Sequence, residues 1–385
     1  MSNFGLENPV LKEYASINTA NEIAAQPELW LEIYRQIHDD KKRISSFLDE
    51  VLPDVCKIIL TGAGTSAFIG LSLHGTFYRS LKTHTEAIAT TDLVSHPNDY
   101  FFNNESIILV SFSRSGNSPE SSAAVALADK LCNRCFHIIV TCDPTGQLIR
   151  YESKSSKLIL LLPSEANDKS LAMTASYSGM LLCGFLIARV KEIDGMRHQI
   201  EILRQYGINI LDHYAYQLKK IASLDFDRVV FLGSGPFYGT ATESQLKLQE
   251  LTDGAIICKN DSYLGFRHGP KAVTNENTLM VFILSNNHYV QQYEKDLVLS
   301  MNKGKKALFT IAISESPVSG LEFDLEIKLS DTGTLLDEEL LTVCDILPGQ
   351  LLGFFKSLAL GLNPDSPSKS GAISRVVENV IIYKY

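Results

Sequence analysis

The sequence has no excess of positive charge and no long apolar run. Its 385 residues include 35 Lys and Arg against 44 Asp and Glu, a formal net charge of -9 at pH 7. A general nucleic-acid binder needs a basic face to neutralise phosphates, so the composition argues against that class. The most apolar stretch, Met180 to Val190, is shorter than the roughly 20 residues that span a bilayer. We therefore expect a core helix there, and neither a nucleic-acid nor a membrane partner.

A secretory signal is also missing, because the N-terminus carries scattered acids and lacks the apolar core of a signal peptide. This predicts a soluble cytoplasmic protein. Cysteine is scarce and odd in number, with seven residues scattered through apolar contexts such as Cys183 and Cys258, which is typical of reduced core thiols. Cys132 and Cys135 form a C-x-x-C, but no second pair or histidine cluster at ligand spacing accompanies it, so we predict no metal site.

The hydrophobic content of 45% over this length suffices for two ordinary domains. Residues 1 to about 50 show helical spacing of apolar residues, in an amphipathic run that we expect Pro27 to start. Beyond it, short apolar strands alternate with helical segments, which favours parallel sheets with ligands beyond the carboxyl ends of the strands. The strands are expected at 57–60, 107–110, 137–141 and 157–162, and again, after a long helical passage, at 228–232, 280–284 and 308–313.

The restart near residue 228 predicts an internal duplication. The expected fold is α/β, with two tandem doubly wound parallel-sheet domains behind a helical segment. We place the helical segment at 1–45, the first domain at 46–215 and the second at 216–385.

The stretch V-S-F-S-R-S-G-N-S-P-E-S-S, from Val110 to Ser122, joins a predicted strand to a predicted helix. Pro119 suits the first helical position and Ser118 can cap it. Serine hydroxyls, free amides and the positive end of a helix dipole would then surround one point, which are the ingredients of a phosphate cradle. The alternative is a βα turn whose hydroxyls only satisfy the local backbone. A nucleotide P-loop is not expected, because no G-K-[ST] is present.

A second loop, T-G-A-G-T-S-A, follows the strand expected at 57–60. Gly62, Gly64 and Ala67 match the looser dinucleotide fingerprint G-x-G-x-x-A, and Glu86 lies where a ribose-binding acid could sit. A dinucleotide enzyme is therefore an alternative. The same glycines would equally serve a loop that brings backbone close to another ligand, with Ser66 at the start of the next helix.

The helix expected after Pro236 contains E-S-Q-L-K-L-Q-E, in which Glu243, Lys247 and Glu250 share one face. A solvated ion-pair stripe would explain this pattern without any function. Downstream, R-H-G-P places His268 in a loop that we expect to project, and N-P-D-S-P-S-K-S places Lys369 in a proline-rich loop near the C-terminus.

Together, G-A-G-T-S, S-F-S-R-S-G-N-S, E-S-Q-L-K-L-Q-E, R-H-G-P and S-P-S-K-S resemble the sugar isomerase (SIS) superfamily, in this order and over nearly the whole chain from about residue 50. The chain is similar to the isomerase half of glucosamine-6-phosphate synthase, without a cysteine-led glutaminase domain in front, so ammonia from glutamine is not expected in cis. In length and motif form it looks most like the AgaS-type galactosamine-6-phosphate deaminase/isomerases, also named tagatose-6-phosphate ketose/aldose isomerases.

The resemblance implies roles for individual residues. Glu250 matches the acid that moves the proton between C1 and C2, with Lys247 one turn before it. His268 matches a ring-opening histidine contributed by a neighbouring subunit, which implies a homodimer or higher homo-oligomer with shared active sites, and Lys369 matches a lysine near the sugar carbonyl. The residues implied in holding the sugar phosphate and its surroundings are Gly64, Thr65, Ser66, Ser113, Arg114, Ser115 and Ser118.

Two positions depart from the synthase pattern: Arg114 replaces a glutamine and Asn117 replaces an acid. These changes leave the contacts to the sugar hydroxyls open.

The implied reaction converts galactosamine 6-phosphate and water to tagatose 6-phosphate and ammonia, without metal or organic cofactor. Ring opening calls for a group that titrates near neutrality, such as histidine, and moving the C2 proton to C1 calls for one desolvated carboxylate. Three alternatives remain: a ketose/aldose phosphate isomerase without deamination, a glucosamine-6-phosphate deaminase, and a non-catalytic sugar-phosphate sensor. Against the sensor stand Glu250, His268 and Lys369, which binding alone would not need, and the lack of a helix-turn-helix or basic arm.

Overall fold

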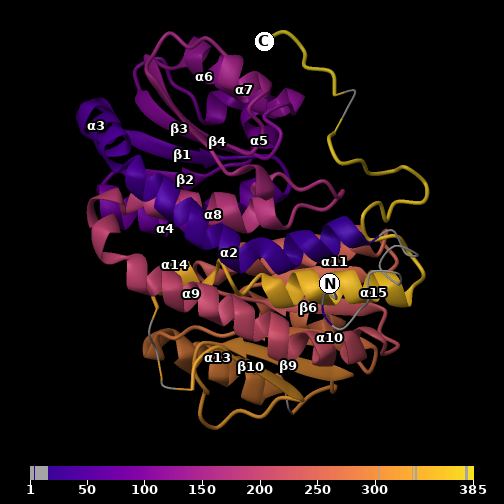
Figure 1. Cartoon of the computed structure of the whole chain (residues 1–385). Helices are drawn as coiled ribbons and strands as arrows, with labels where there is room; N and C mark the ends of the chain where they lie inside the picture. The colour runs from indigo at the N-terminus through magenta and orange to yellow at the C-terminus, as the bar shows by residue number, and fades with distance from the viewer. Residues whose placement is uncertain (1–3, 5–15, 302, 332, 334–335, 378–379) are drawn as a thin grey trace. The chain divides into compact units, whose positions relative to one another are not determined.

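The computed structural model of the protein describes residues 4, 16–301, 303–331, 333, 336–377 and 380–385 (Figure 1). Of the helical segment expected at 1–45, residues 1–3 and 5–15 lie outside the described residues. The chain divides into two compact units. The first-sheet unit comprises Glu28–Asp168, Met173–Ile200 and Ile373–Tyr385. The second-sheet unit comprises Met1–Pro27, Lys169–Ala172 and Glu201–Ala372. The domain boundaries expected at 45 and 215 stay a prediction.

The first-sheet unit is built on five parallel strands in the order β2-β1-β3-β4-β5 (Figure 1). The strands are β1 Lys57–Thr61, β2 His84–Ala87, β3 Ser106–Ser113, β4 Arg134–Thr141 and β5 Lys157–Leu161. Its helices are α3 Lys41–Val51, η1 Leu52–Asp54, α4 Thr65–Leu81, α5 Thr90–Ser95, η2 Pro97–Asp99, α6 Pro119–Leu131, α7 Gln147–Arg150, η3 Ser164–Ala166, α8 Ala175–Ala188 and η4 Val190–Gly195. Parallel strands require crossovers, which these helices supply.

The second-sheet unit repeats this plan with strands in the order β10-β9-β8-β6-β7, all parallel. Its strands are β6 Arg228–Leu232, β7 Ile257–Asp261, β8 Thr278–Ile283, β9 Phe309–Ser314 and β10 Leu325–Lys328. Its helices are the π-helical turn η5 Ile210–Tyr214, then α10 Ala215–Ala222, α11 Phe237–Leu251, α12 Tyr263–Phe266, η6 Pro270–Val273, α13 His288–Met301, α14 Glu338–Leu341 and α15 Leu347–Ala359. The helices α2 Ile17–Asp39 and α9 Arg197–Asn209 each begin in one unit and end in the other.

Read from β7, the second sheet runs β7-β6-β8-β9-β10, so β6 corresponds to β1 and β8 to β3. The tandem doubly wound α/β fold is confirmed. Three short strands, β2, β7 and β10, were not predicted, because their four or five residues mix polar and apolar side chains. That the two halves arose by duplication stays a prediction.

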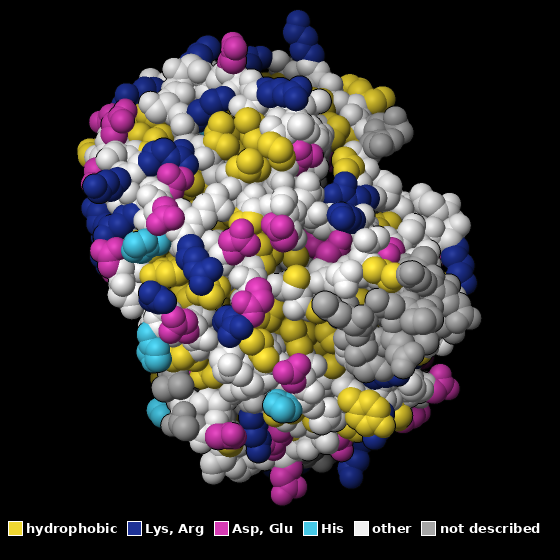
Figure 2. All heavy atoms as spheres, viewed as in Figure 1, with side chains coloured by type: hydrophobic (Ala, Val, Ile, Leu, Met, Phe, Trp, Pro, Cys, Tyr) yellow, Lys and Arg dark blue, Asp and Glu magenta, His cyan; other side chains and the backbone are white. Residues whose placement is uncertain are grey.

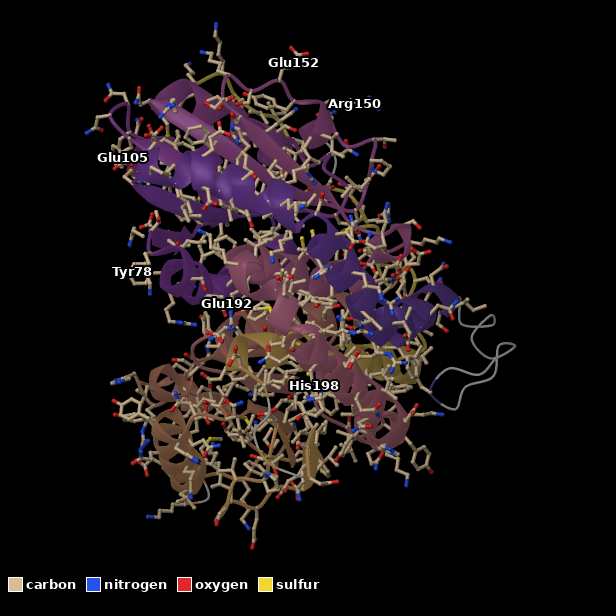
Figure 3. The ribbon with its side chains drawn as sticks, turned by 60° about the vertical axis from the view of Figure 1, so that its left-hand side comes forward. Tyr78, Glu105, Arg150, Glu152, Glu192 and His198 are labelled. Atoms are coloured by element: carbon tan, nitrogen blue, oxygen red, sulfur yellow. The ribbon has the colours of Figure 1, made fainter. Side chains whose placement is uncertain are left out.

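The apolar stretch near residue 180 forms α8, in which every residue is buried, so the expected core helix is confirmed. It packs against α4, and Trp30 of α2 donates from its indole N–H to Ser178 Oγ at 2.9 Å. No helix among the described residues is both long and apolar enough to cross a bilayer. Figure 3 shows the outside of this unit, where the side chains of Tyr78, Arg150 and Glu152 point away from the ribbon.

The prediction that Pro27 starts the N-terminal helix is wrong, because α2 begins at Ile17 and contains Pro27 in its interior. A proline there removes the hydrogen bond to the carbonyl four residues back, that of Ile23. Gln26 replaces this donor: its side-chain amide lies 3.4 Å from Ile23 O and also donates to Gln350 Oε1 at 2.6 Å. A local side-chain donor therefore lets the helix continue through the proline.

Candidate functional site

The strand order places the candidate ligand-binding edge of the first sheet. The order β2-β1-β3-β4-β5 is the flavodoxin-like arrangement, in which ligands bind at the switch point beyond the carboxyl ends of the first and third strands. Here those strands are β1 and β3, which pair in register from Lys57 with Ile107 to Thr61 with Ser111. The G-A-G-T-S turn leaves from the first of these ends, and the loop of residues 114–118 between β3 and α6, called the serine loop below, leaves from the second. The order also differs from the 3-2-1-4-5-6 order of dinucleotide-binding folds, which weakens the dinucleotide alternative.

The serine loop starts later than expected, since β3 continues through Ser113 rather than ending near Val110. The Ser113 hydroxyl accepts the Gly116 N–H at 3.1 Å, and the Ser115 hydroxyl accepts the Asn117 N–H at 3.2 Å. These are the local bonds expected of a βα turn whose hydroxyls satisfy the backbone. Because a hydroxyl can accept and donate at once, both side chains keep a hydrogen to offer an anion.

The helix after the loop begins at Pro119 as predicted, with Ser118 in the N-cap position. The expected capping bond from Ser118 is absent: its hydroxyl lies 2.5 Å from Ser121 Oγ instead. Gly116 has φ +62°, and a Cβ on it would approach Gly146 Cα to 3.2 Å. This position needs glycine on both grounds.

The G-A-G-T-S turn is equally tight. A Cβ on Gly62 would come within 2.6 Å of Ser66, whereas Gly64 has φ +55° and faces open space. Gly64 is the N-cap of α4, so Thr65 and Ser66 occupy its first two positions, and both side chains are buried. The predicted phosphate-binding residues therefore line the starts of α4 and α6, where helix dipoles favour an anion.

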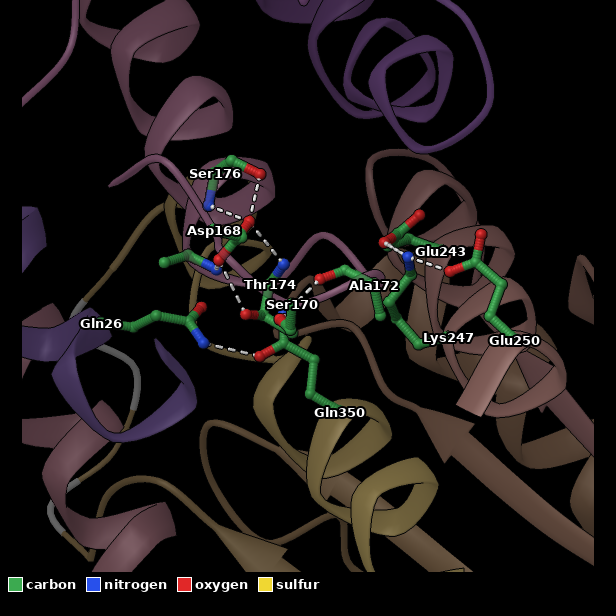
Figure 4. Close-up of polar contacts among 11 residues, drawn as sticks. Gln26, Asp168, Ser170, Ala172, Thr174, Ser176, Glu243, Lys247, Glu250 and Gln350 are labelled. Atoms are coloured by element: carbon green, nitrogen blue, oxygen red, sulfur yellow. Dashed lines mark hydrogen bonds and ion pairs between the residues drawn. The ribbon is translucent and has the colours of Figure 1, made fainter. Parts of the chain in front are cut away.

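Helix α11 carries Glu243, Lys247 and Glu250 on one face, as the helical spacing predicted (Figure 4). The ammonium of Lys247 lies 3.4 Å from Glu243 Oε1 and 2.5 Å from Glu250 Oε2. The side chains of Glu243 and Lys247 are 0% and 1% exposed, and that of Glu250 is 23% exposed. A solvated stripe is therefore excluded: only Glu250 reaches solvent from an otherwise buried ion cluster.

Burial lowers the pKa of Lys247, but the two carboxylates outweigh it and hold the pKa above its ordinary value. The lysine therefore stays charged and holds the Glu250 carboxylate in one orientation. Glu243 was seen in the sequence but not included in the site. Together with Glu250, this fully buried side chain keeps the lysine protonated.

Lys369 lies in the second-sheet unit on a loop attached to the end of α11. Its backbone N–H donates to Asp253 Oδ2 at 3.2 Å, three residues beyond Glu250, and its side chain is exposed. His268 projects as predicted, since it is exposed between α12 and Gly269, whose φ is +112°. Among the described residues its imidazole makes no hydrogen bond or ion pair.

The loop after β8 corresponds to the serine loop and has a different chemistry. Ser285 donates its N–H to both oxygens of Glu294, at 3.0 and 3.3 Å, and its hydroxyl to Glu338. Asn286 donates to Glu315 Oε2 at 2.7 Å. Burial, with a smaller contribution from Glu338, raises the pKa of Glu294 to about 8. Sequence reasoning missed this acid, although a glutamate followed by Leu297 and Val298 at helical spacing was a usable signal.

Both C-x-x-C cysteines, Cys132 and Cys135, are free thiols, and Cys135 belongs to a buried polar network. His137 Nε2 lies 2.8 Å from Asp129 Oδ1, and Nδ1 lies 3.9 Å from Cys135 Sγ, so the ring bridges the two groups with opposite nitrogens. Tyr151 and Ser153 donate to the same carboxylate at 2.9 and 3.1 Å. Although burial would raise it, these hydrogen bonds lower the pKa of Asp129, and burial raises that of Cys135. Because the Asp129 carboxylate already accepts three hydrogen bonds and the Cys135 thiol stays protonated, we interpret this network as structural.

Comparison with known proteins agrees with this geometry. A family model described as the SIS domain matches residues 52–188. The D-galactosamine-6-phosphate deaminase AgaS of Shewanella sp. (strain ANA-3) is 37% identical over 390 residues, covering 100% of this chain and 96% of that protein. The protein of the same name from Escherichia coli is 35% identical over 95% of this chain and 96% of its own length.

Solved structures give the same assignment. The tagatose-6-phosphate ketose/aldose isomerase of Escherichia coli superimposes with a TM-score of 0.85 at 32% identity, over 96% of both chains. A structure from Clostridium novyi NT that provisionally carries the same isomerase name has a TM-score of 0.95 at 38% identity, over 100% of both chains. From its full-length identity to these relatives, the chain belongs to the AgaS family of SIS-domain proteins.

Proposed function

We propose that the protein converts galactosamine 6-phosphate and water to tagatose 6-phosphate and ammonia. Two relatives that match almost the whole chain at 35–37% identity bear the name of this deaminase. The observation that carries the proposal is the ion cluster on α11, in which a buried, charged Lys247 holds a partly exposed Glu250. A protein that only bound the sugar would not need a proton-transferring carboxylate held in this way.

In the proposed reaction, His268 moves a proton at the ring oxygen and so opens the sugar. Glu250 then removes the proton from C2 and returns it to C1, while the ammonium of Lys369 stabilises the negative charge that develops on the sugar oxygen. Isomerisation of a 2-amino aldose leaves an imine at C2. Water adds to this imine and ammonia leaves, so that the oxygen of water becomes the C2 carbonyl oxygen of the ketose phosphate.

The serine hydroxyls and loop amides at the ends of β1 and β3 are proposed to hold the phosphate. Neutral donors and helix N-termini suffice for a phosphate monoester, as at other helix-start anion sites. The residues in this role are Gly64, Thr65, Ser66, Ser113, Ser115 and Ser118.

We also propose a cytoplasmic homodimer or larger homo-oligomer in which His268 serves the active site of a neighbouring subunit. The support is that His268 is exposed and makes no polar contact within the described part of its own chain. Mixing inactive His268→Ala and Glu250→Gln variants should restore part of the turnover, since a mixed assembly contains one intact set of groups. Full activity from a monomer in sedimentation experiments would contradict this arrangement.

A second candidate is ketose/aldose isomerisation without deamination, which the names of the structural neighbours favour. A substrate panel separates the possibilities: galactosamine 6-phosphate, glucosamine 6-phosphate and tagatose 6-phosphate, each assayed for ammonia and for ketose or aldose formation. We expect ammonia and ketose in equal amounts from galactosamine 6-phosphate. Ketose without ammonia would support the isomerase, and no product from any substrate would remove both.

A further inference from the structure

Arg114 is the first residue of the serine loop after β3, but its side chain does not point to solvent. The residue is 5% exposed, and its guanidinium Nη2 donates to the backbone carbonyl of Arg375. Arg375 belongs to the C-terminal tail, here residues Ile373–Tyr385, of the same first-sheet unit. An arginine flanked by two predicted phosphate ligands therefore holds the backbone of a segment more than 250 positions away.

The tail is held a second time at the same residue. The Arg375 side chain donates from Nε to the carbonyl of Asp168 at 2.9 Å and from Nη2 to Asn167 Oδ1 at 3.0 Å. Asp168 is itself fixed, because its fully buried carboxylate accepts the N–H groups of Thr174 and Ser176 at 2.9 and 3.0 Å, at the start of α8. Arg375 is therefore tied through its carbonyl to the serine loop and through its guanidinium to a rigid helix start.

The tail continues directly from the loop that bears Lys369, six positions before Arg375. Fixing the backbone at 375 limits the conformations of the short segment between the two residues, because a hydrogen bond to a carbonyl fixes the main chain and not only a side chain. Arg114 also reaches two atoms further than the glutamine seen at this position in the resembling synthase. A glutamine would offer neither that length nor the positive charge.

We propose that Arg114 is a positioning residue: it holds the C-terminal tail against the serine loop and thereby restricts the loop of Lys369, instead of contacting the sugar. This inference rests on the proposed function for the role of Lys369. The anchoring of the tail does not depend on that function and has a readout of its own.

Trypsin cleavage of the Arg375–Val376 bond measures the anchoring, because a protease must pull the scissile segment free of its contacts. Intact mass reports the loss of residues 376–385. We expect Arg114→Met to accelerate this cleavage at least tenfold, with Arg114→Lys in between because one ammonium keeps part of the bond. Arg150→Met, which removes an exposed arginine of α7, is the matched control and should leave the rate unchanged.

Kinetics distinguish positioning from direct contact with substrate. We expect Arg114→Met to lower kcat for galactosamine 6-phosphate about tenfold with KM changed less than threefold. Arg375→Ala should act in the same direction, and the double variant should be no slower than the slower single variant, because both side chains hold one backbone segment. Circular dichroism and a thermal midpoint within a few degrees of the parent show that each variant folds.

Two results would overturn the inference. One is an unchanged cleavage rate in Arg114→Met; the other is a KM raised tenfold or more, which would make Arg114 a substrate ligand. If the parent protein turns over no hexosamine phosphate, the proposed function fails while the proteolysis comparison still decides whether Arg114 anchors the tail.

Discussion

The loop after β3 and the loop after β8 follow corresponding strands of two sheets with the same strand order, yet they present opposite chemistry. The first gathers serine hydroxyls and bends at Gly116, with α6 starting directly behind it. The second has Ser285 and Asn286, whose donors are already used by Glu294, Glu338 and Glu315. An anion would meet serine hydroxyls at the first loop, whereas at the second loop glutamate side chains already occupy the donors.

This difference implies that the two sheets divide the chemistry between them. The first provides neutral donors for a phosphate, and the second provides acidic side chains, of which Glu250 reaches solvent and Glu294 does not. Charges of both signs are interspersed on the face shown in Figure 2, so no broad field selects the substrate there. The substrate must therefore be selected by groups that contact it directly.

Replacing Glu250 by Gln should have the largest effect and should separate catalysis from binding. The amide keeps the shape and an acceptor for Lys247 but cannot take a proton, so we expect kcat to fall about 10³- to 10⁴-fold. Binding of galactosamine 6-phosphate, measured by calorimetry, should change less than threefold. Turnover within tenfold of the parent would assign the proton transfer to another group.

The pH dependence of stability tests whether Glu294 is buried and protonated beside the loop after β8. Its pKa is raised from an ordinary value near 4.5 to about 8, so the folded protein holds a proton that the unfolded chain has lost. This contribution is fully present below about pH 4.5 and is lost as pH rises through about 8, with a size of roughly 3–5 kcal/mol. The free energy of unfolding of the parent minus that of Glu294→Gln should therefore fall between pH 5 and 8.5. A difference that stays constant over this range would contradict the buried, protonated acid.

Removing hydroxyls from the first loop should weaken binding and spare chemistry. In the double variant Ser115→Ala with Ser118→Ala, we expect KM for galactosamine 6-phosphate to rise about 100-fold, on the order of 3 kcal/mol for two hydrogen bonds to a charged group. Asn287→Ala, at an exposed position in the loop after β8, is the control and should leave KM unchanged. Equal effects of the two changes would show that the loops do not differ in function.

The smallest expected effect concerns the bend of the first loop. Gly116→Ala should destabilise the protein by about 1–3 kcal/mol, because alanine disfavours a φ of +62° and its Cβ would press on Gly146. Gly195→Ala, where a Cβ would meet no atom within 4 Å, should change stability by less than about 0.5 kcal/mol. Chemical denaturation of both variants tests this, and equal midpoints would show that the loop tolerates a side chain.

Periodicity and order along the chain predicted most of the fold, because buried parallel strands such as β3 and β8 appear as continuous apolar runs. The same reasoning failed at Pro27, where the compensating donor is the neighbouring Gln26, and at β2, β7 and β10, whose four or five residues mix polar and apolar side chains. Such short strands are defined by the strand beside them, which local propensity does not contain.

Helical spacing brought Glu243, Lys247 and Glu250 onto one face, but it could not distinguish a solvated stripe from a buried cluster. Burial of Lys247 is a property of the folded chain, in which α11 packs against α15, β6 and β7. The sequence also could not predict the hydrogen bond between Arg114 and Arg375, because the two residues are 261 positions apart and no local pattern connects them.

The most direct test of the division between the sheets is the stoichiometry of sugar-phosphate binding. Calorimetric titration of Glu250→Gln with galactosamine 6-phosphate avoids turnover and counts the sites. We predict one site per chain, which the Ser115→Ala, Ser118→Ala double change abolishes at the same concentrations. Two sites per chain, or one site that survives loss of both hydroxyls, would contradict the claim that only the first sheet binds the phosphate.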